Sequence, residues 1–232
     1  MKAARKDPNA RLEYTTIMLV NRVLAFNFLQ SYSNTLTLTN QVYDLISLPK
    51  GTFEETIAAM RKEISEALET KEGWTHEFVN NLPVMDSFLR ESLRDNPIGE
   101  VGLERTIIKK DGFTFSNGLH VPYGTTLASP LKAIQHDAKN YPGGFNPKRS
   151  LEDPNHPKST DIGPDFLNFG LGRPACPGRW FAANLQKLAL SHLVMDYDFE
   201  RVDVRPAGVR KVTLVEPCGR SLITLRKREI QA

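Results

Sequence analysis

Hydrophobic residues recur at helical spacing through the first part of the chain. The pattern over Leu12–Ser47 predicts one long helix, which Pro49-Lys50-Gly51 ends. Thr52 and Glu55 fit a capping box, which predicts that a second helix begins at that point. A third helix is predicted from about Pro83 to Asp95, because proline is well tolerated in the first turn of a helix. The apolar stripe of the second helix comprises Ile57, Met60, Ile64 and Leu68.

Short β-leaning runs separated by Gly and Asn turns follow the third helix. These runs are Leu103–Ile108, Phe113–Phe115, His120–Val121 and Thr125–Ala128. The segment Pro142–Pro164 holds five prolines and has no clear period, which is typical of a long functional loop. Apolar residues from Trp180 to Leu193 predict another helix, and Phe199–Leu225 predicts strands with a hairpin. The order of elements predicts a single α+β unit over residues 1–232 that is mainly helical.

Composition narrows the functional class only slightly. The 232 residues are 40% hydrophobic and 25% charged, which is ordinary for a globular protein. A net charge of +3 is too small to indicate nucleic-acid binding, although a local basic patch for an acidic partner stays possible. The most apolar early stretch, Thr15–Phe28, is interrupted by Asn21 and Arg22, so no membrane-spanning helix is predicted. The five histidines have no metal-ligand spacing, and no zinc site is expected.

The strongest chemical signal is the run Phe169-Gly170-Leu171-Gly172-Arg173-Pro174-Ala175-Cys176-Pro177-Gly178. It predicts a glycine-bearing loop that presents Cys176 just before a helix. Backbone N–H groups at a helix start stabilise a thiolate. The simpler alternative is a buried free cysteine in a turn, and Cys218, in a Pro-Cys-Gly turn, fits only that alternative. Two cysteines make no disulfide framework and suit a reducing compartment.

This run resembles the cysteine-ligand loop of the cytochrome P450 family, whose pattern is Phe, two residues, Gly, three residues, Cys, one residue, Gly. Phe169, Gly172, Cys176 and Gly178 fill every fixed position. The continuation from Pro177 is similar to that of fungal members. The resemblance implies that these four residues bind haem and that Cys176 is the axial ligand of the haem iron, where a thiolate favours O–O cleavage.

A second signal is Glu91-Ser92-Leu93-Arg94, which places Glu91 and Arg94 on one helix face. Such a pair is common and by itself weak evidence. It is followed by Phe145-Asn146-Pro147-Lys148-Arg149 ahead of the cysteine loop. In the family, a second arginine from such a segment joins the Glu–Arg pair. The resemblance therefore implies a buried structural triad of Glu91, Arg94 and Arg149 that holds the loop beneath the haem.

The resemblance also implies contacts with the haem propionates. Arg105 stands where family members carry a propionate-binding arginine on a strand. The simpler alternative is a solvated arginine. The residue two before the cysteine is usually Arg or His in the family, but in this chain it is Pro174, and the neighbouring Arg173 is the candidate replacement.

The oxygen-activating groove of the long helix is the weakest match. The family has two small residues, any residue, an acidic or polar residue, then threonine, and these positions align with Leu29-Gln30-Ser31-Tyr32-Ser33. Ser33 keeps a hydroxyl and is the candidate catalytic residue, with Asn34 or Thr35 as substitutes. The alternative is a polar helix segment without a role in catalysis, since Ser31–Asn40 is rich in side chains that compete for backbone hydrogen bonds.

The resemblance implies a haem-thiolate monooxygenase of fungal secondary metabolism that inserts one oxygen atom of O2 into an apolar substrate. Electrons would come from NADPH through a cytochrome reductase that docks near the cysteine. The segments Ile98–Gly102 and Val215–Pro217 are expected to face the substrate. Two alternatives stay open: a haem-binding remnant without catalysis, and a chain that holds no haem and only binds partners.

The resemblance covers nearly the whole chain but only the C-terminal half of the family fold. Full-length members begin with a membrane anchor and several helices that cover the substrate pocket, and we expect this chain to be a truncated product or a fragment. Full-length relatives are expected at the cytoplasmic face of the endoplasmic reticulum membrane, whereas the sequence indicates no location for this chain.

Overall fold

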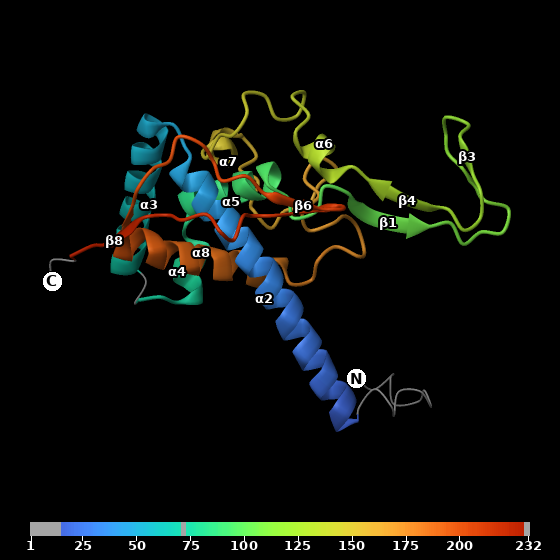
Figure 1. Cartoon of the computed structure of the whole chain (residues 1–232), viewed down its shortest axis with the longest axis horizontal. Coiled ribbons are helices and arrows are strands. Elements are labelled where there is room, and N and C mark those ends of the chain that lie inside the picture. Colours follow the sequence, from blue (N-terminus) through green and yellow to red (C-terminus); the bar gives the residue numbers. More distant parts are fainter. Residues whose placement is uncertain (1–14, 71–72, 230–232) are drawn as a thin grey trace.

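The computed structural model describes residues 15–70 and 73–229. Helices pack together at one end of the molecule, and a narrow β-ribbon projects from the other (Figure 1). The helices are α2 (Thr16–Ile46), α3 (Lys50–Thr70), α4 (His76–Asn80), α5 (Pro83–Asp95), α6 (Leu131–Gln135), α7 (Arg149–Glu152) and α8 (Arg179–Asp196). This arrangement confirms the predicted α+β class with mainly helical content.

Four antiparallel pairs make up the β-structure of the described residues. The strands are β1 (Gly102–Thr106), β2 (Phe113–Thr114), β3 (His120–Val121), β4 (Thr126–Ser129), β5 (Tyr197–Phe199), β6 (Val209–Lys211), β7 (Leu214–Glu216) and β8 (Leu225–Lys227). The pairs are β1–β4, β2–β3, β5–β8 and β6–β7. The register of β1 shifts between Gly102 and Arg105, where Leu103 has a positive φ of 56°. This bulge bends the strand beside the cysteine loop.

The main core lies where α3, α5 and α8 meet the C-terminal turns of α2. Its largest fully buried side chains include Leu45, Met60, Phe78, Phe88 and Leu190. The third predicted helix matches α5 in both bounds, with Pro83 in its first turn. Helix α5 therefore stands in the centre, in contact with α2, α3, α7 and α8.

The predicted start of the second helix is wrong. Helix α3 begins at Lys50, so Thr52 lies inside its first turn and does not cap it. The carbonyl of Pro49 accepts a hydrogen bond from Phe53 N at 2.8 Å, so Pro49 opens the helix. Helix α2 has already ended at Ile46, so Pro49 acts only at the start of α3, where its carbonyl accepts a hydrogen bond and its missing N–H is not needed. The short helices α4, α6 and α7 were missed because none is long enough to show a period.

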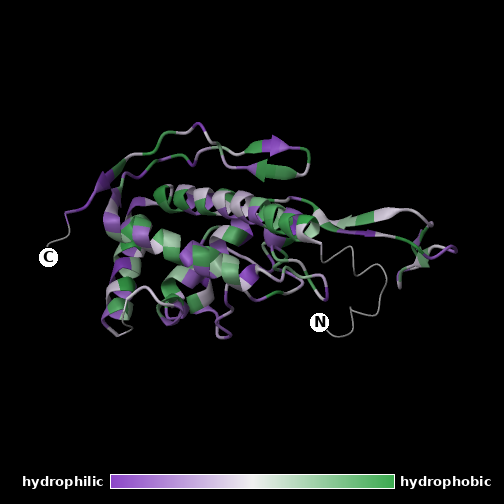
Figure 2. Ribbon diagram, turned by 90° about the horizontal axis from the view of Figure 1, so that it is seen from below, coloured by the Kyte–Doolittle hydropathy of each residue, from purple (hydrophilic) through white to green (hydrophobic). Residues whose placement is uncertain are grey.

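Helix α2 differs between its two halves. The described N-terminal turns are exposed on every side, as for Ile17 (71%), Phe28 (70%) and Leu29 (64%), whereas Asn40–Ile46 are buried. Hydrophobic colouring covers the N-terminal turns in Figure 2. Residues 12–14, which the sequence pattern includes in this helix, lie outside the described ranges. None of the described helices is long and apolar enough to cross a membrane.

Candidate functional site: the cysteine cavity

The cysteine loop turns tightly just before α8. Gly170 and Gly172 both adopt positive φ, 76° and 70°, a conformation that favours glycine. Cys176 N donates a 2.6 Å hydrogen bond to Phe169 O, which closes the loop. A Cβ at Gly178 would lie 4.0 Å from Cys176 Sγ, so the absence of a side chain keeps one side of the sulfur open.

The sulfur lies at a cavity of about 210 Å³ between α2, α5 and the start of α8. Its walls are mostly apolar, and the polar groups on them are uncharged. The lining residues are Ser33, Asn34, Thr37, Leu89, Leu93, Ile98, Gly99, Leu131, Asn168, Phe169, Cys176, Ala182, Ala183 and Gln186. The cavity therefore brings Cys176 and Phe169 together with Ser33, which is 143 residues before Cys176 in the chain.

The polar run of α2 stays helical because its side chains bond back to the helix. Ser33 Oγ donates to Leu29 O at 2.8 Å, and Thr37 Oγ1 donates to Ser33 O at 2.9 Å. Asn34 Nδ2 donates to Gln30 O at 2.8 Å. These bonds satisfy the polar groups without ending the helix. Ser33, which lines the cavity, thus directs its hydroxyl proton to the helix backbone.

A buried chain of side-chain amides joins α2 to α8 behind the cavity. Gln186 Nε2 donates to Asn34 Oδ1 at 2.9 Å and to Asn34 O at 3.0 Å. Gln41 Nε2 donates to Gln186 Oε1 at 3.1 Å. Sequence reasoning missed Gln41 and Gln186, because glutamines within helical patterns are normally exposed. The chain of amides fixes the Asn34 carboxamide at the cavity wall.

The carboxylate of Glu91, on α5, accepts hydrogen bonds from both Arg94 and Arg149. Arg94 donates to its carboxylate from Nε and Nη2, each at 2.8 Å. Arg149, at the start of α7, donates from Nε at 3.0 Å and from Nη2 at 3.3 Å. Asn146 N adds a fifth hydrogen bond at 2.8 Å. The cluster ties α5 to the irregular segment that leads to the cysteine loop.

Pairing between opposite charges favours the charged forms of Glu91 and Arg94. Burial favours the neutral form of Glu91, but the hydrogen bonds from Arg94 and Arg149 outweigh it and hold the pKa of Glu91 below its usual value. Burial likewise favours neutral Arg94, but the hydrogen bonds to Glu91 raise the Arg94 pKa. Tyr141 lies beneath both guanidinium groups, at 5.0 Å from Arg94 and 5.7 Å from Arg149. Both Glu91 and Arg94 are therefore held in their charged forms.

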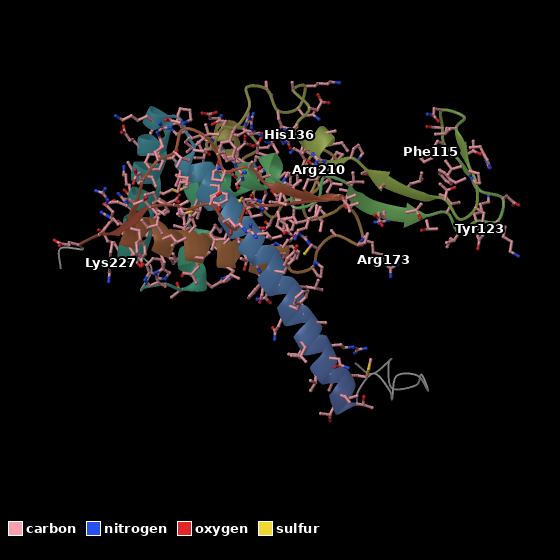
Figure 3. The ribbon with its side chains drawn as sticks, viewed as in Figure 1. Phe115, Tyr123, His136, Arg173, Arg210 and Lys227 are labelled. Carbon is pink, nitrogen blue, oxygen red and sulfur yellow. The ribbon has the colours of Figure 1, made fainter. Side chains whose placement is uncertain are left out.

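The candidate propionate ligands lie outside the cavity lining. Arg105, on β1, is exposed, and its Nη1 donates to Glu104 O at 2.6 Å. Arg173 is exposed on the cysteine loop (Figure 3). The bulged strand β1 still approaches the loop, because a Cβ at Gly170 would lie 3.5 Å from a methyl carbon of Leu103.

The two segments expected to face the substrate meet in the structure. Val215 N donates to Ile98 O at 3.0 Å, and Glu100 N donates to Thr213 O at 2.8 Å. Ile98 and Gly99 line the cavity, whereas Val215–Pro217 do not. The β6–β7 hairpin also contacts α2, because Tyr32 Oη donates to Glu216 Oε1 at 2.5 Å.

The family model for cytochrome P450 matches residues 35–217, which is most of the chain. This chain belongs to the cytochrome P450 family. Cytochrome P450 monooxygenase 151 of Postia placenta is 35% identical to it over 229 residues, covering 94% of this chain and 44% of that protein. Cytochrome P450 monooxygenase gloP of Glarea lozoyensis is 30% identical, covering 98% of this chain and 45% of that protein.

The fold comparison agrees with the family assignment. The crystal structure of a cytochrome P450 (CYP102L1) superimposes with a TM-score of 0.70 at 21% identity, over 91% of this chain and 46% of that one. At this identity the likeness shows the fold alone. The chain spans about half the length of these P450 relatives.

The lining of the cavity has the chemistry that a haem requires. Cys176 supplies one soft sulfur donor, and the remaining lining is apolar or uncharged, which suits a flat apolar macrocycle with one thiolate ligand. The open side left by Gly178 admits a close approach to the sulfur. The enclosed volume of about 210 Å³ is below the ~300–1,000 Å³ of usual ligand pockets. The residues fit the group chemically, and the described chain encloses part of its site.

Proposed function

We propose that this chain is the haem-binding half of a cytochrome P450 monooxygenase that oxidises an apolar small molecule. One observation carries the proposal: Cys176, on its glycine loop, and Ser33, on the long helix, line the same apolar cavity. Bound haem would supply the activation of dioxygen, and the protein would supply position and electrostatics. Residues 1–232 would form one partial domain of the complete fold.

Each named residue has a separate task in this proposal. Cys176 binds the haem iron, while Phe169, Gly172 and Gly178 shape the loop around the sulfur. Arg105 holds a propionate once its exposed guanidinium turns from the Glu104 carbonyl.

Ser33 donates its proton towards the cavity when it leaves the carbonyl of Leu29. The Glu91 cluster fixes the segment beneath the loop through five hydrogen bonds. None of Glu91, Arg94 and Arg149 is among the described residues that line the cavity, so the cluster acts on the site through the backbone.

The partners follow from the same reasoning. An NADPH-dependent cytochrome reductase would deliver electrons at the face that carries the cysteine loop, and an apolar substrate would enter beside Ile98. The names of the fungal relatives, which include paxQ of Penicillium paxilli, support a monooxygenase role. We propose secondary metabolism as the setting and the cytoplasmic face of the endoplasmic reticulum membrane as the location of the whole enzyme.

The thiolate assignment is tested by carbon monoxide spectroscopy. The longest native polypeptide that contains this chain is reconstituted with haem and reduced, and carbon monoxide is added. A thiolate ligand gives a strongly red-shifted absorption band. Cys176→Ala should abolish the band, and the matched control Cys218→Ala should retain it.

Three results would count against the proposal. Loss of the band in Cys218→Ala but not in Cys176→Ala would show that Cys218, and not Cys176, is the ligand. Failure to bind haem at all would favour the alternative of a chain that only binds partners. Haem binding with a normal band but no substrate oxidation would favour a haem-binding remnant without catalysis. Leu29 and Gln30 suggest this alternative, because the family has small residues at these two positions.

A further inference from the structure

A buried carboxylate on α2 joins three segments that border the cysteine cavity. The side chain of Asp44 is 1% exposed, and both of its oxygens accept hydrogen bonds. Asp44 Oδ2 accepts from Ser92 Oγ, on α5, at 2.6 Å. Asp44 Oδ1 accepts from Asn96 Nδ2 at 2.8 Å and from Arg205 Nε at 2.5 Å. Asp44 therefore lies where α2, the end of α5 and the segment ahead of β6 meet.

The bond to Asn96 fixes the start of one cavity wall. Asn96 follows the last residue of α5, and its own N–H donates to Ser92 O at 2.9 Å. Ile98 and Gly99, which line the cavity, come two and three residues later, after Pro97. The ring of Pro97 limits rotation of the chain between Asn96 and this wall. The position of the Asn96 side chain therefore sets where the wall begins.

The bond to Arg205 fixes the segment that leads to the β6–β7 hairpin. Arg205 also donates from Nη2 to Asn40 Oδ1 at 2.9 Å, one turn before Asp44 on α2. In Figure 1 the segment that contains Arg205 passes beside α2 on its way to β6. The hairpin then meets the cavity wall, where Val215 N donates to Ile98 O at 3.0 Å. Asp44 is therefore linked to both partners of this contact.

Asp44 and Arg205 form a partly buried charged pair. Burial raises the pKa of Asp44 to about 6, while the charge of Arg205 and the Ser92 hydroxyl oppose that shift. The carboxyl is therefore ionised at neutral pH and pairs with Arg205, whose side chain is 25% exposed. Charge-assisted hydrogen bonds are stronger than neutral ones. Asparagine at position 44 would keep the shape of the side chain but would lose the charge and one acceptor oxygen.

We propose that Asp44 is a positioning residue of the cysteine cavity, which holds the Ile98–Gly99 wall and the β6–β7 hairpin in one arrangement through Asn96 and Arg205. Asp44 is not among the described residues that line the cavity, so it acts through these two side chains. A wall that is fixed in advance packs on a bulky apolar ligand at a lower cost in ordering than a mobile one. The role of Asp44 toward a ligand rests on the proposed function, whereas its hold on the wall does not require haem.

Amide hydrogen exchange of this chain tests the hold on the wall. Asp44→Asn should speed exchange about tenfold in residues 98–102 and 209–216, because loss of a charge-assisted bond lets the hairpin leave the wall. Arg205→Gln should do the same. The double variant should exceed the larger single effect by less than about twofold, because both changes remove one shared interaction. Where Asp44→Asn does not accumulate, Arg205→Gln, at the more exposed position, is measured in its place.

Two control variants separate this role from general stability. Ile64→Val perturbs a fully buried residue of the α3 core that lies outside the cavity lining. Asp198→Asn changes an acid of the same kind, which accepts from Arg61 Nη2 at 2.7 Å beside β5. Both should leave exchange in residues 98–102 and 209–216 within about twofold of the wild type, since the hairpin opens locally and not through global unfolding.

Two ligands of the haem iron test the consequence for the site. The longest native polypeptide that contains this chain is reconstituted with haem, and imidazole and 4-phenylimidazole are titrated by the absorption of the haem. Both bind iron through a ring nitrogen, but only 4-phenylimidazole carries a phenyl ring that can pack on an apolar wall. Asp44→Asn should weaken binding of 4-phenylimidazole about fivefold and that of imidazole less than about twofold. Ile64→Val should change the two affinities equally.

The outcomes distinguish this role from the proposed function. Unchanged exchange in Asp44→Asn, or equal weakening of the two ligands, overturns the positioning role, while a normal carbon monoxide band in the same protein leaves the proposed function intact. Faster exchange throughout the chain, rather than in residues 98–102 and 209–216, would show that Asp44 serves general stability only. Failure to bind haem would overturn the proposed function, and hydrogen exchange would then decide the role of Asp44.

Discussion

Removal of the Glu91 carboxylate should destabilise the fold more than removal of any exposed acid. Glu91→Ala deletes five hydrogen bonds and leaves Arg94, whose side chain is 3% exposed, without its main counter-charge. Breaking a buried pair in this way costs about 3–5 kcal/mol. That loss is a large part of the ~5–15 kcal/mol by which a protein of this kind is stable. We therefore expect poor soluble expression and loss of haem incorporation.

Two further variants test whether the loss of stability increases with the burial of the side chain removed. Arg94→Ala should cost more than Arg149→Ala, because the side chain of Arg149 is 20% exposed and water replaces part of its interaction. Glu55→Ala is the matched control: Glu55 pairs with Lys148 at the surface, and its side chain is 63% exposed. An exposed pair of this kind contributes about 0–1 kcal/mol.

The assay is urea unfolding followed by far-ultraviolet circular dichroism, with the free energy of unfolding extrapolated to water. Where Glu91→Ala does not accumulate, Glu91→Gln is measured instead, since it keeps the shape and loses the charge. The reasoning is refuted if the Glu91 variant unfolds at the same urea concentration as Glu55→Ala. A fully folded, fully haem-loaded Glu91→Ala protein would also remove the proposed role of the cluster.

Two other positions offer independent tests. Glu63 accepts backbone bonds from Val84 N at 2.6 Å and Met85 N at 3.1 Å, and burial raises its pKa from 4.5 to about 7. The raised pKa means that its contribution to stability is full below pH 4.5 and is lost as the pH rises through about 7, by about 3 kcal/mol, and Glu63→Gln should flatten that part of the pH profile of unfolding. Gly170→Ala, at φ 76°, should cost about 1–2 kcal/mol in thermal unfolding, whereas Gly51→Ala, in the helical first turn of α3, should be neutral or slightly stabilising. Equal effects of the two glycine substitutions would contradict the argument from backbone conformation.

What the sequence determined by itself is local. The glycine and cysteine offsets around Cys176 identify the loop, because positive-φ turns and a helix start depend on neighbouring residues only. Pro83 sets the first turn of α5, and Glu91 meets Arg94 because residues three apart share a helix face. Only the family resemblance links Arg149 to that pair, since nothing in its spacing from Glu91 along the chain requires contact.

Tertiary structure decided the contacts between distant segments. Gln186 reaches Asn34 across 152 residues, and only the packing of α8 on α2 places both amides in one buried chain. The start of α3 at Lys50 also escaped the sequence pattern, because a local cap signal at Thr52 gave way to an earlier start that the carbonyl of Pro49 supports. Local propensity amounts to at most about 1 kcal/mol per residue, whereas burial of a helix face contributes several times more, so packing decides which distant side chains, such as Gln186 and Asn34, meet.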